Sequence, residues 1–333
     1  MLPLALTMGE PAGIGGEIAL QAWLRRAQGV PVFYVIDDPL RLATLAGQLG
    51  WEVPVQAIAA PKEAPSAFMR SLPVLPLGGA PEAEPGRPHP ADAAMVIASI
   101  DMAMADVQAG RAAAIVTNPI NKDALYRAGF RHPGHTEYLA QLAGLPERDA
   151  VMMLACPELR VVPVTIHLPL RDAVEALSTA AIVRAGRITH EALRRDFGIA
   201  APVLAVAGLN PHAGENGALG SEDLDIVAPA VEQLRADGIV ARGPLPPDTM
   251  FHAEARTGYD AALCMYHDQA LIPIKTIDFH GGVNTTLGLP FIRTSPDHGT
   301  GFDIAGKGVA RPDSLIAALR LAAEMAAQRA RAT

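Results

Sequence analysis

The sequence predicts an α/β protein in layers around a largely parallel sheet, and three observations lead to this prediction. Short apolar runs alternate with longer stretches of helical periodicity. The runs are bounded by Gly, Pro, Asn or Asp, as buried strands are. The chain has 333 residues and is 50% hydrophobic, which suits two moderate cores better than one small core.

The expected elements follow from these patterns. Helices are predicted over 92–109, 178–197, 222–236 and 313–329, with Ser178 as a capping residue. The close spacing of 150–155 and 160–165 allows an antiparallel hairpin and therefore a mixed sheet. The Pro-rich stretch 54–90 has little periodicity, so we expect a long surface excursion there. Strands are predicted over 2–7, 32–36, 113–117, 150–155, 160–165, 202–207 and 261–266.

Composition argues against two classes of protein. Only 19% of the residues are charged and the net charge is −8, whereas a nucleic-acid surface needs clustered Lys and Arg. No apolar run reaches the ~18 residues that a membrane helix needs. Cys156 and Cys264 each stand in an apolar run, as buried thiols of a cytosolic protein do. We therefore expect a cytoplasmic protein that binds neither nucleic acid nor membrane.

Three histidines share one setting. His167, His212 and His267 each stand where a predicted strand gives way to a loop. Ligands of open α/β sheets collect at the carboxyl ends of strands, and three imidazoles around a divalent cation leave a coordination position for substrate. Asp268 directly follows His267, where a carboxylate would orient a ligand histidine. The alternative is three unrelated loop histidines that bond to the backbone.

Two segments suit the binding of an anion. His135 and Thr136 precede an apolar-periodic stretch, where Thr136 would cap a helix whose positive end favours a phosphate or carboxylate. An ordinary N-cap is the alternative. Lys275, Asn284 and Arg293 stand in a stretch otherwise poor in charge, and basic groups in such a setting suit an anionic substrate.

A glycine-rich segment, GEPAGIGG at 9–16, follows the first predicted strand. The dinucleotide fingerprint G-x-G-x-x-G fails there, because its third glycine would fall at Ile18. The segment therefore predicts a tight strand-to-helix turn and no ordinary Rossmann site.

Motifs along the whole chain resemble those of the 4-hydroxythreonine-4-phosphate dehydrogenase family. They are GEPAGIG at 9–15, PGHTE at 133–137, HLPLRD at 167–172, GLNPHAGE at 208–215, GPLPPDT at 243–249, MYHDQ at 265–269 and GVNTTLGLPFIRTSPDHGT at 282–300. The resemblance implies a homodimer of the two-lobed isocitrate/isopropylmalate-dehydrogenase-like fold, with the metal and active site at the subunit interface. It implies a cofactor lobe at 1–130 plus 296–333, and a substrate, metal and dimerisation lobe at 131–295.

The resemblance also assigns roles to residues. Metal ligands would be His167, His212 and His267, and substrate contacts would be His135, Thr136, Lys275, Asn284 and Arg293. The segment 297–308 is similar to the cofactor loop of isopropylmalate dehydrogenases, which implies that NAD or NADP binds at His298, Gly299, Thr300, Asp303 and Gly306. Asp303 would meet a ribose hydroxyl. Catalytic candidates are Asp248, Lys122 and Asp268, with the general base left open. The segment TNPINK at 117–122 departs from the family form TGPVHK but retains Lys122.

The implied activity is oxidation of 4-phosphooxy-L-threonine with NAD or NADP and one divalent metal. The product, 2-amino-3-oxo-4-phosphooxybutanoate, decarboxylates to 3-amino-2-oxopropyl phosphate in pyridoxine 5′-phosphate biosynthesis. Three imidazoles suit zinc, with magnesium or cobalt as alternatives. Sister dehydrogenases acting on 4-phospho-threonate or a cis-dihydrodiol are the nearest alternatives. The others are a non-catalytic metal- or phosphometabolite-binding protein and a metal-dependent hydrolase with Asp248 or Asp268 as its base.

Overall fold

The structure is a computed structural model that describes residues 2–127, 129–130, 132 and 134–332. Of the PGHTE motif, Pro133 therefore lies outside the described residues. The chain divides into two compact units. Unit 1 is Met1–Gly144 with Pro290–Ala327, and unit 2 is Leu145–Leu289 with Gln328–Thr333. The sequence led us to expect lobe boundaries at 130/131 and 295/296. In the structure, His135, Thr136 and Arg293 lie in unit 1, whereas the expected bounds put them in the second lobe.

Unit 1 contains a parallel run of strands flanked by helices. Its strand order is β3 (Val55–Ala57), β4 (Leu72–Pro76), β2 (Phe33–Asp37), β1 (Leu4–Thr7), β5 (Ile115–Val116) and β12 (Arg293–Pro296), and every pair is parallel. The helices are α1 (Gly15–Leu24), α2 (Pro39–Gln48), α3 (Ala64–Phe68), α4 (Ala93–Gln108), α5 (Lys122–Arg127), α6 (His135–Leu142) and α12 (Asp313–Ala332). Short 3₁₀ turns are η1 (Arg26–Gln28), η2 (Pro61–Glu63) and η3 (Pro90–Asp92).

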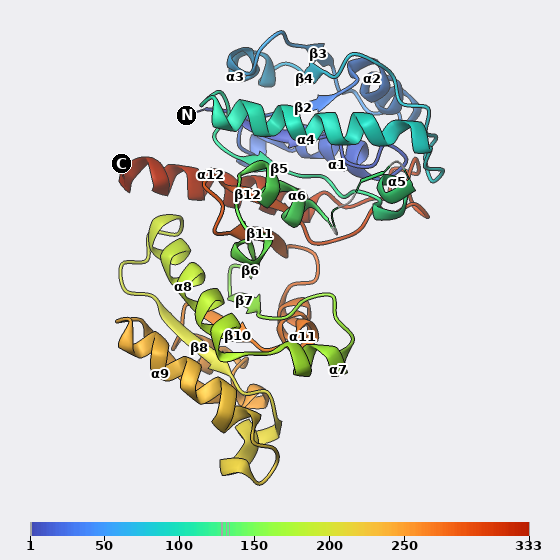
Figure 1. The fold of residues 1–333 in the computed structure, drawn as a ribbon. Coiled ribbons are helices and arrows are strands. Elements are labelled where there is room, and N and C mark those ends of the chain that lie inside the picture. The colour runs from blue at the N-terminus through green and yellow to red at the C-terminus, as the bar shows by residue number, and fades with distance from the viewer. Residues whose placement is uncertain (1, 128, 131, 133, 333) are drawn as a thin grey trace. The chain divides into compact units, whose positions relative to one another are not determined.

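Helix α4 is tied to the strands of unit 1 by a buried hydroxyl. Helix α4 lies across β1 and β2 (Figure 1). Ser99 on α4 is fully buried, accepts a hydrogen bond from Met8 N at 2.9 Å and donates one to Ile36 O at 2.8 Å. Because β1 pairs with β2 on one side and β5 on the other, the strand order reverses at β1, where α/β sheets usually bind ligands.

Unit 2 contains a mixed sheet, as the sequence allowed. Its strand order is β11 (Val283–Leu287), β6 (Val151–Cys156), β7 (Leu159–Pro163), β10 (Ala261–Cys264), β8 (Val203–Ala207) and β9 (Val240–Leu245). Strand β6 is antiparallel to both β11 and β7, which confirms the predicted hairpin. The pairs β7–β10, β10–β8 and β8–β9 are parallel.

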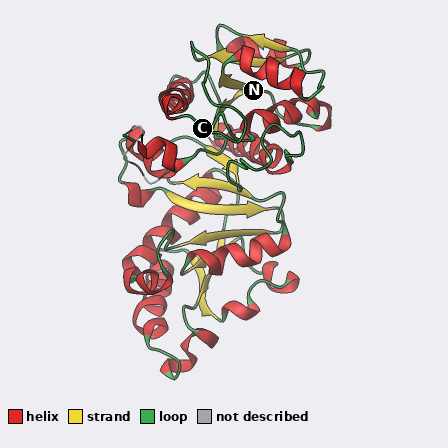
Figure 2. Cartoon of the chain, turned by 90° about the vertical axis from the view of Figure 1, so that its right-hand side faces the viewer, coloured by secondary structure: helices red, strands yellow, loops and turns green. Residues whose placement is uncertain are grey.

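Helices cover both faces of the sheet of unit 2 (Figures 1 and 2). Side chains alternate along a strand, so Leu204 and Val206 enter the core under α8 and α9, whereas Ala205 and Ala207 enter the core under α11. The helices of unit 2 are α7 (Leu170–Ala176), α8 (Thr179–Arg195), α9 (Ala228–Ala236), α10 (Ala253–Arg256) and α11 (His267–Ile277), with the turns η4 (Glu147–Asp149), η5 (Pro211–Gly217), η6 (Asp223–Val227) and η7 (Pro247–Thr249). Helices on both faces of a largely parallel sheet confirm the predicted α/β fold class.

Local sequence signals gave both correct and wrong expectations. Ser178 caps α8 by accepting from Ala181 N at 3.3 Å, and both cysteines are buried, as predicted. The expected surface excursion at 54–90 is wrong, because it contains β3, α3 and β4. Strand β3 is at the sheet edge with its side chains half-buried or exposed, so no apolar run marks it. Within the described residues, no helix is long and apolar enough to span a membrane.

Candidate functional site

The three candidate metal ligands follow neighbouring parallel strands of unit 2. His167 follows β7, His267 begins α11 after β10, and His212 lies in η5 after β8. Strand β10 pairs in parallel with β7 on one side and with β8 on the other. The carboxyl ends of the three strands therefore meet at one edge of the sheet, and each supplies one histidine there.

Two of these histidines are adjacent. The ring centroids of His167 and His267 are 5.9 Å apart, and both rings line a cavity of 270 Å³ with Thr165 and Tyr266. Nδ1 of His267 lies 2.7 Å from Oδ1 of Asp268. This contact orients the imidazole and leaves Nε2 as the nitrogen for a cation, in the carboxylate–histidine–metal arrangement. The sequence analysis expected Asp268 to orient His267 because the two residues are adjacent, and the structure places them in contact.

His212 stands at the start of a left-handed turn. Residues 212–216 all have positive φ, with φ 53° at His212, and His167 has φ 54°. Left-handed backbone is costly for residues other than glycine, so tertiary contacts must hold it. Within the described part of the chain, no three His, Cys, Asp or Glu side chains converge to hold a metal. One chain therefore brings His167 and His267 together but does not add His212 as a third ligand.

A buried carboxylate holds the loop that leads to His212. Asp223 is 1% exposed and accepts hydrogen bonds from Leu209 N at 2.7 Å and Asn210 N at 3.0 Å. A Cβ at Gly208 would come within 2.9 Å of Oδ1 of Asp223, so glycine is required for this close approach. Asp223 does not stand out in the sequence, where it is an acid at the start of a predicted helix, a position that is usually solvated.

The other candidates of unit 2 are spread over three elements. Asp248 is exposed on η7, which packs against the η5 turn that carries His212. Lys275 is in the last turn of α11, with Nζ 5.4 Å from the centroid of the Phe279 ring. Asn284 is on β11, and its buried Oδ1 has no hydrogen-bond partner among the described residues.

Helix α6 of unit 1 begins differently from the prediction. Gly134 is the N-cap, His135 is the first helical residue and Thr136 is the second, so the expected cap at Thr136 is wrong. The reason is the extended backbone of Gly134, which takes the position before the helix. The free N–H groups of the first turn remain beside His135, as an anion site requires.

Basic groups gather around this helix start. Burial, and then the charges of Arg293 and Lys122, hold the pKa of His135 well below its usual range. Its imidazole is therefore neutral at pH 7, and the buried Nε2 has no partner within the described residues. Arg293 on β12 is 4% exposed, bonds to Oγ1 of Thr117 at 2.7 and 3.2 Å, and has its pKa lowered by burial to about 10. The structure thus gathers Lys122, His135 and Arg293 into one cluster of basic groups, the candidate anion-binding cluster of unit 1.

The candidate cofactor residues His298, Gly299, Thr300, Asp303 and Gly306 lie on the segment between β12 and α12. This segment packs against the glycine-rich turn at 9–16. Ile14 N donates to Thr300 O at 2.9 Å, and a Cβ at Gly13 would lie 2.7 Å from that oxygen. Glu17, which the sequence analysis did not single out, accepts hydrogen bonds from Gly306 N and Gly308 N. Its only sequence signal was one carboxylate in the otherwise apolar start of α1.

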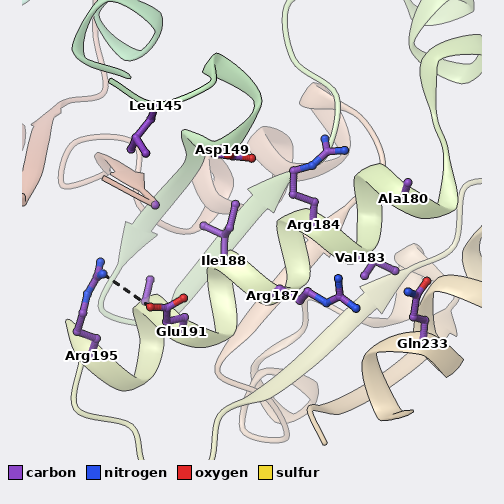
Figure 3. Close-up of a pocket in the computed structure, with 12 residues that line it drawn as sticks. Leu145, Asp149, Ala180, Val183, Arg184, Arg187, Ile188, Glu191, Arg195 and Gln233 are labelled. Carbon is purple, nitrogen blue, oxygen red and sulfur yellow. Dashed lines mark ion pairs between the residues drawn. The ribbon is translucent and has the colours of Figure 1, made fainter. Parts of the chain in front are cut away.

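Unit 2 has a hollow of 540 Å³ beside α8. Figure 3 draws the residues that line it. Arg184, Arg187 and Arg195 line it, but no candidate site residue does. Arg187 is paired with Asp237 at 2.7 Å, and Arg195 pairs with Asp196 at 2.9 Å. Its size does not make it the functional site, because two of its three arginines are already neutralised.

Comparisons with known proteins agree over nearly the whole chain. The family model of the pyridoxal phosphate biosynthetic protein PdxA matches residues 30–322. A 4-hydroxythreonine-4-phosphate dehydrogenase of Bradyrhizobium diazoefficiens is 58% identical over 98% of this chain and 97% of the relative. The crystal structure of the same enzyme from Klebsiella pneumoniae is 39% identical with a TM-score of 0.87, covering 98% of this chain and 100% of that chain. A terephthalate 1,2-cis-dihydrodiol dehydrogenase from Burkholderia xenovorans LB400 is 30% identical with a TM-score of 0.66, covering 96% and 97%.

Proposed function

This chain belongs to the family of the pyridoxal phosphate biosynthetic protein PdxA, and on that premise we propose that it oxidises 4-phosphooxy-L-threonine with a nicotinamide dinucleotide. The product would be 2-amino-3-oxo-4-phosphooxybutanoate, which loses CO₂ to give 3-amino-2-oxopropyl phosphate. The observation that carries the proposal is the set of histidines at one sheet edge, with His167 and His267 already adjacent.

The residues at this edge fit a divalent cation. The 5.9 Å between the ring centroids of His167 and His267 suits two imidazoles that point at one ion, and Asp268 fixes the tautomer of His267. His212 is the third proposed ligand, and a set of three imidazoles favours zinc over magnesium or cobalt. A cation held there would supply Lewis-acid stabilisation of the alkoxide that develops on the substrate.

The partner subunit is proposed to complete this metal site. Among the described residues no three-ligand cluster forms within one chain, although three histidines follow the same edge. Leu168 and Leu170, next to His167, are 45% and 62% exposed, as apolar side chains at a subunit interface are in the isolated chain. We propose a homodimer in which His212 joins His167 and His267 across the interface.

The phosphate of the substrate is assigned to the anion-binding cluster of unit 1. His135 and Thr136 present the first turn of α6, and the guanidinium of Arg293 is buried beside them. Such an arrangement binds a phosphate by charge-assisted hydrogen bonds and the helix dipole. By the family motif, Lys275 and Asn284 of unit 2 are the remaining substrate contacts.

The proton of the substrate hydroxyl needs an acceptor, and three residues are candidates. Asp248 is exposed on the turn that packs against the His212 turn, so it can exchange the proton with solvent. Asp268 is bonded to His267, so we assign it to orienting that ring. Lys122 belongs to the anion-binding cluster, where its charge acts on His135. We therefore assign it to binding the negative charge of the substrate. We therefore propose Asp248 as the general base.

The dinucleotide is assigned to the segment that carries His298, Gly299, Thr300, Asp303 and Gly306. A dinucleotide held there would supply the acceptor for the hydride that leaves C3 of the substrate. Asp303 is exposed, and a carboxylate at a ribose hydroxyl repels the 2′-phosphate of NADP, so we propose NAD as the better acceptor. The two buried free thiols, Cys156 and Cys264, suit a cytoplasmic enzyme.

One assay tests the proposed function against its alternatives. The purified dimer is given 4-phosphooxy-L-threonine, 4-phospho-threonate or a cis-dihydrodiol, each with NAD or NADP, and reduced nicotinamide is followed by absorbance. We expect turnover with the first substrate, loss of turnover with a chelator and recovery with zinc. Turnover of 4-phospho-threonate alone would assign the chain to the sister activity. Full activity in chelator would reject the metal site.

A further inference from the structure

The segment 297–312, which follows β12 and precedes α12, forms no strand or helix. Its position therefore depends on contacts from other elements. Within unit 1 the start of α1 supplies them. Ile14 N donates to Thr300 O at 2.9 Å, Glu17 accepts from Gly306 N and Gly308 N, and Nε2 of Gln21 donates to Ala310 O at 2.7 Å.

These contacts come from one face of the helix. Ile14, Glu17 and Gln21 are spaced by three and four residues, so they lie one above another along α1. The three positions meet the segment at its beginning, middle and end. One helix face therefore holds the whole length of the segment.

Glu17 has the most demanding of these contacts. Its side chain is fully buried, and each of its carboxylate oxygens accepts from one backbone N–H. The ionised carboxylate is the better acceptor for both N–H groups. Burial raises the pKa of Glu17 above its ordinary value, and the hydrogen bonds from Gly306 and Gly308 oppose this shift.

The two donors lie in a turn that Glu17 holds against α1. Gly306 and Gly308 have φ of 77° and 68°, in the left-handed region. Glycine adopts this conformation readily but is not confined to it, so the turn needs outside contacts to stay in place. A Cβ at Gly306 would lie 2.7 Å from Cβ of Pro85. Glu17 and Gly306 also line one cavity of 340 Å³, together with Asp38 and Arg41.

We propose that Glu17 is a positioning residue for the dinucleotide, which holds the backbone of 300–308 in the binding conformation before the cofactor arrives. The inference rests on the proposed assignment of the cofactor to this segment. A preformed loop spares the bound dinucleotide the entropy of ordering it, so loss of Glu17 weakens cofactor binding while leaving the chemistry of the ternary complex intact.

The test compares Glu17→Gln with Asp223→Asn in the full-length metal-loaded protein. Both changes replace a buried carboxylate that accepts from two backbone N–H groups, but Asp223 holds the loop of His212 in unit 2. Hydrogen–deuterium exchange of 297–312 is measured without and with NAD, and the Kd of NAD is measured by calorimetry. We expect E17Q to speed exchange of 297–312 without NAD and to raise the Kd of NAD about tenfold to a hundredfold. The kcat at saturating NAD should stay within about twofold of wild type.

Asp223→Asn should change neither the exchange of 297–312 nor the Kd of NAD. Gln21→Ala is a milder variant, because it removes one neutral hydrogen bond on the same helix face. It should raise the Kd of NAD about threefold to tenfold. Unchanged exchange and Kd in both α1 variants would overturn the inference and leave the proposed function intact. If NAD binds the wild-type protein without slowing exchange in 297–312, the cofactor assignment itself fails, and the role of Glu17 with it.

Discussion

The ring centroids of His167 and His267 lie 5.9 Å apart, just beyond the ends of the adjacent parallel strands β7 and β10. Parallel pairing is the reason for this proximity, because it carries two residues 100 positions apart to the same edge of the sheet. His167 adopts a left-handed backbone to reach this position, and His267 is oriented by Asp268. Two candidate metal ligands are thus held close together in one chain.

His212→Ala is expected to abolish turnover without unfolding the protein. The imidazole is proposed as a third metal ligand, and its loss leaves two ligands from the histidine set. The variant keeps the other residues of the turn and the contacts of Asp223 that hold it, so the fold should be little affected. Steady-state assays and zinc affinity by competition with a chelating dye measure the first effect, and thermal unfolding measures the second. Wild-type zinc affinity in this variant would remove His212 from the ligand set.

Asp223→Asn is expected to weaken zinc binding about tenfold to a hundredfold, the range for residues that support metal ligands. An amide offers only one acceptor, so either Leu209 N or Asn210 N loses its partner and the His212 turn loosens. The matched control is Asp225→Asn, an exposed carboxylate on the same η6 turn. Zinc titrations of the two variants measure the effect, and equal affinities would show that Asp223 does not support the ligand loop.

Arg293→Lys is expected to raise the KM for the phosphorylated substrate about tenfold to a hundredfold, because lysine cannot reproduce the fork of a guanidinium. The substitution keeps the charge, so kcat should fall less than kcat/KM. Initial rates over a range of substrate concentrations give both constants. Arg127→Lys, at an exposed pair with Asp123, serves as the control. A KM equal to that of the control would take Arg293 out of the phosphate site.

The depressed pKa of His135 predicts how stability depends on pH. Unfolded, this histidine takes up a proton below about pH 6.5, whereas the folded protein resists protonation because of burial, Arg293 and Lys122. Its stabilising contribution is therefore complete above pH 6.5 and is lost progressively as the pH falls toward the lower folded pKa.

Thermal unfolding midpoints of wild type and His135→Gln between pH 5 and pH 8 measure this effect. We expect the wild-type midpoint to fall more steeply than that of the variant on acidification below pH 6.5. His280→Gln, at an exposed histidine, is the control and should follow the wild-type curve. Parallel curves for His135→Gln and wild type would contradict the assignment of a buried neutral imidazole.

Local patterns in the sequence determined the fold class, most strands and the edge at which the histidines lie. Apolar runs that stop at His167, His212 and His267 are short-range signals, because burial of a strand and exposure of its end depend on neighbouring residues. Motifs such as GLNPHAGE and MYHDQ also identified the family. Strands β3, β4, β9, β11 and β12 escaped notice. Prolines interrupt the apolar pattern of β4 and β9, and the polar or edge side chains of β3, β11 and β12 give no apolar run.

Only the tertiary structure decided which distant groups meet. The gathering of Lys122, His135 and Arg293 depends on how α5, α6 and β12 pack, and no spacing in the sequence encodes it. The same holds for Glu17 and Asp223, which read as ordinary acids at helix starts. Each supports a loop that carries candidate site residues, because burial removed its water and left backbone N–H groups as its partners. A carboxylate's role is therefore set by what surrounds it in space, which a linear pattern does not contain.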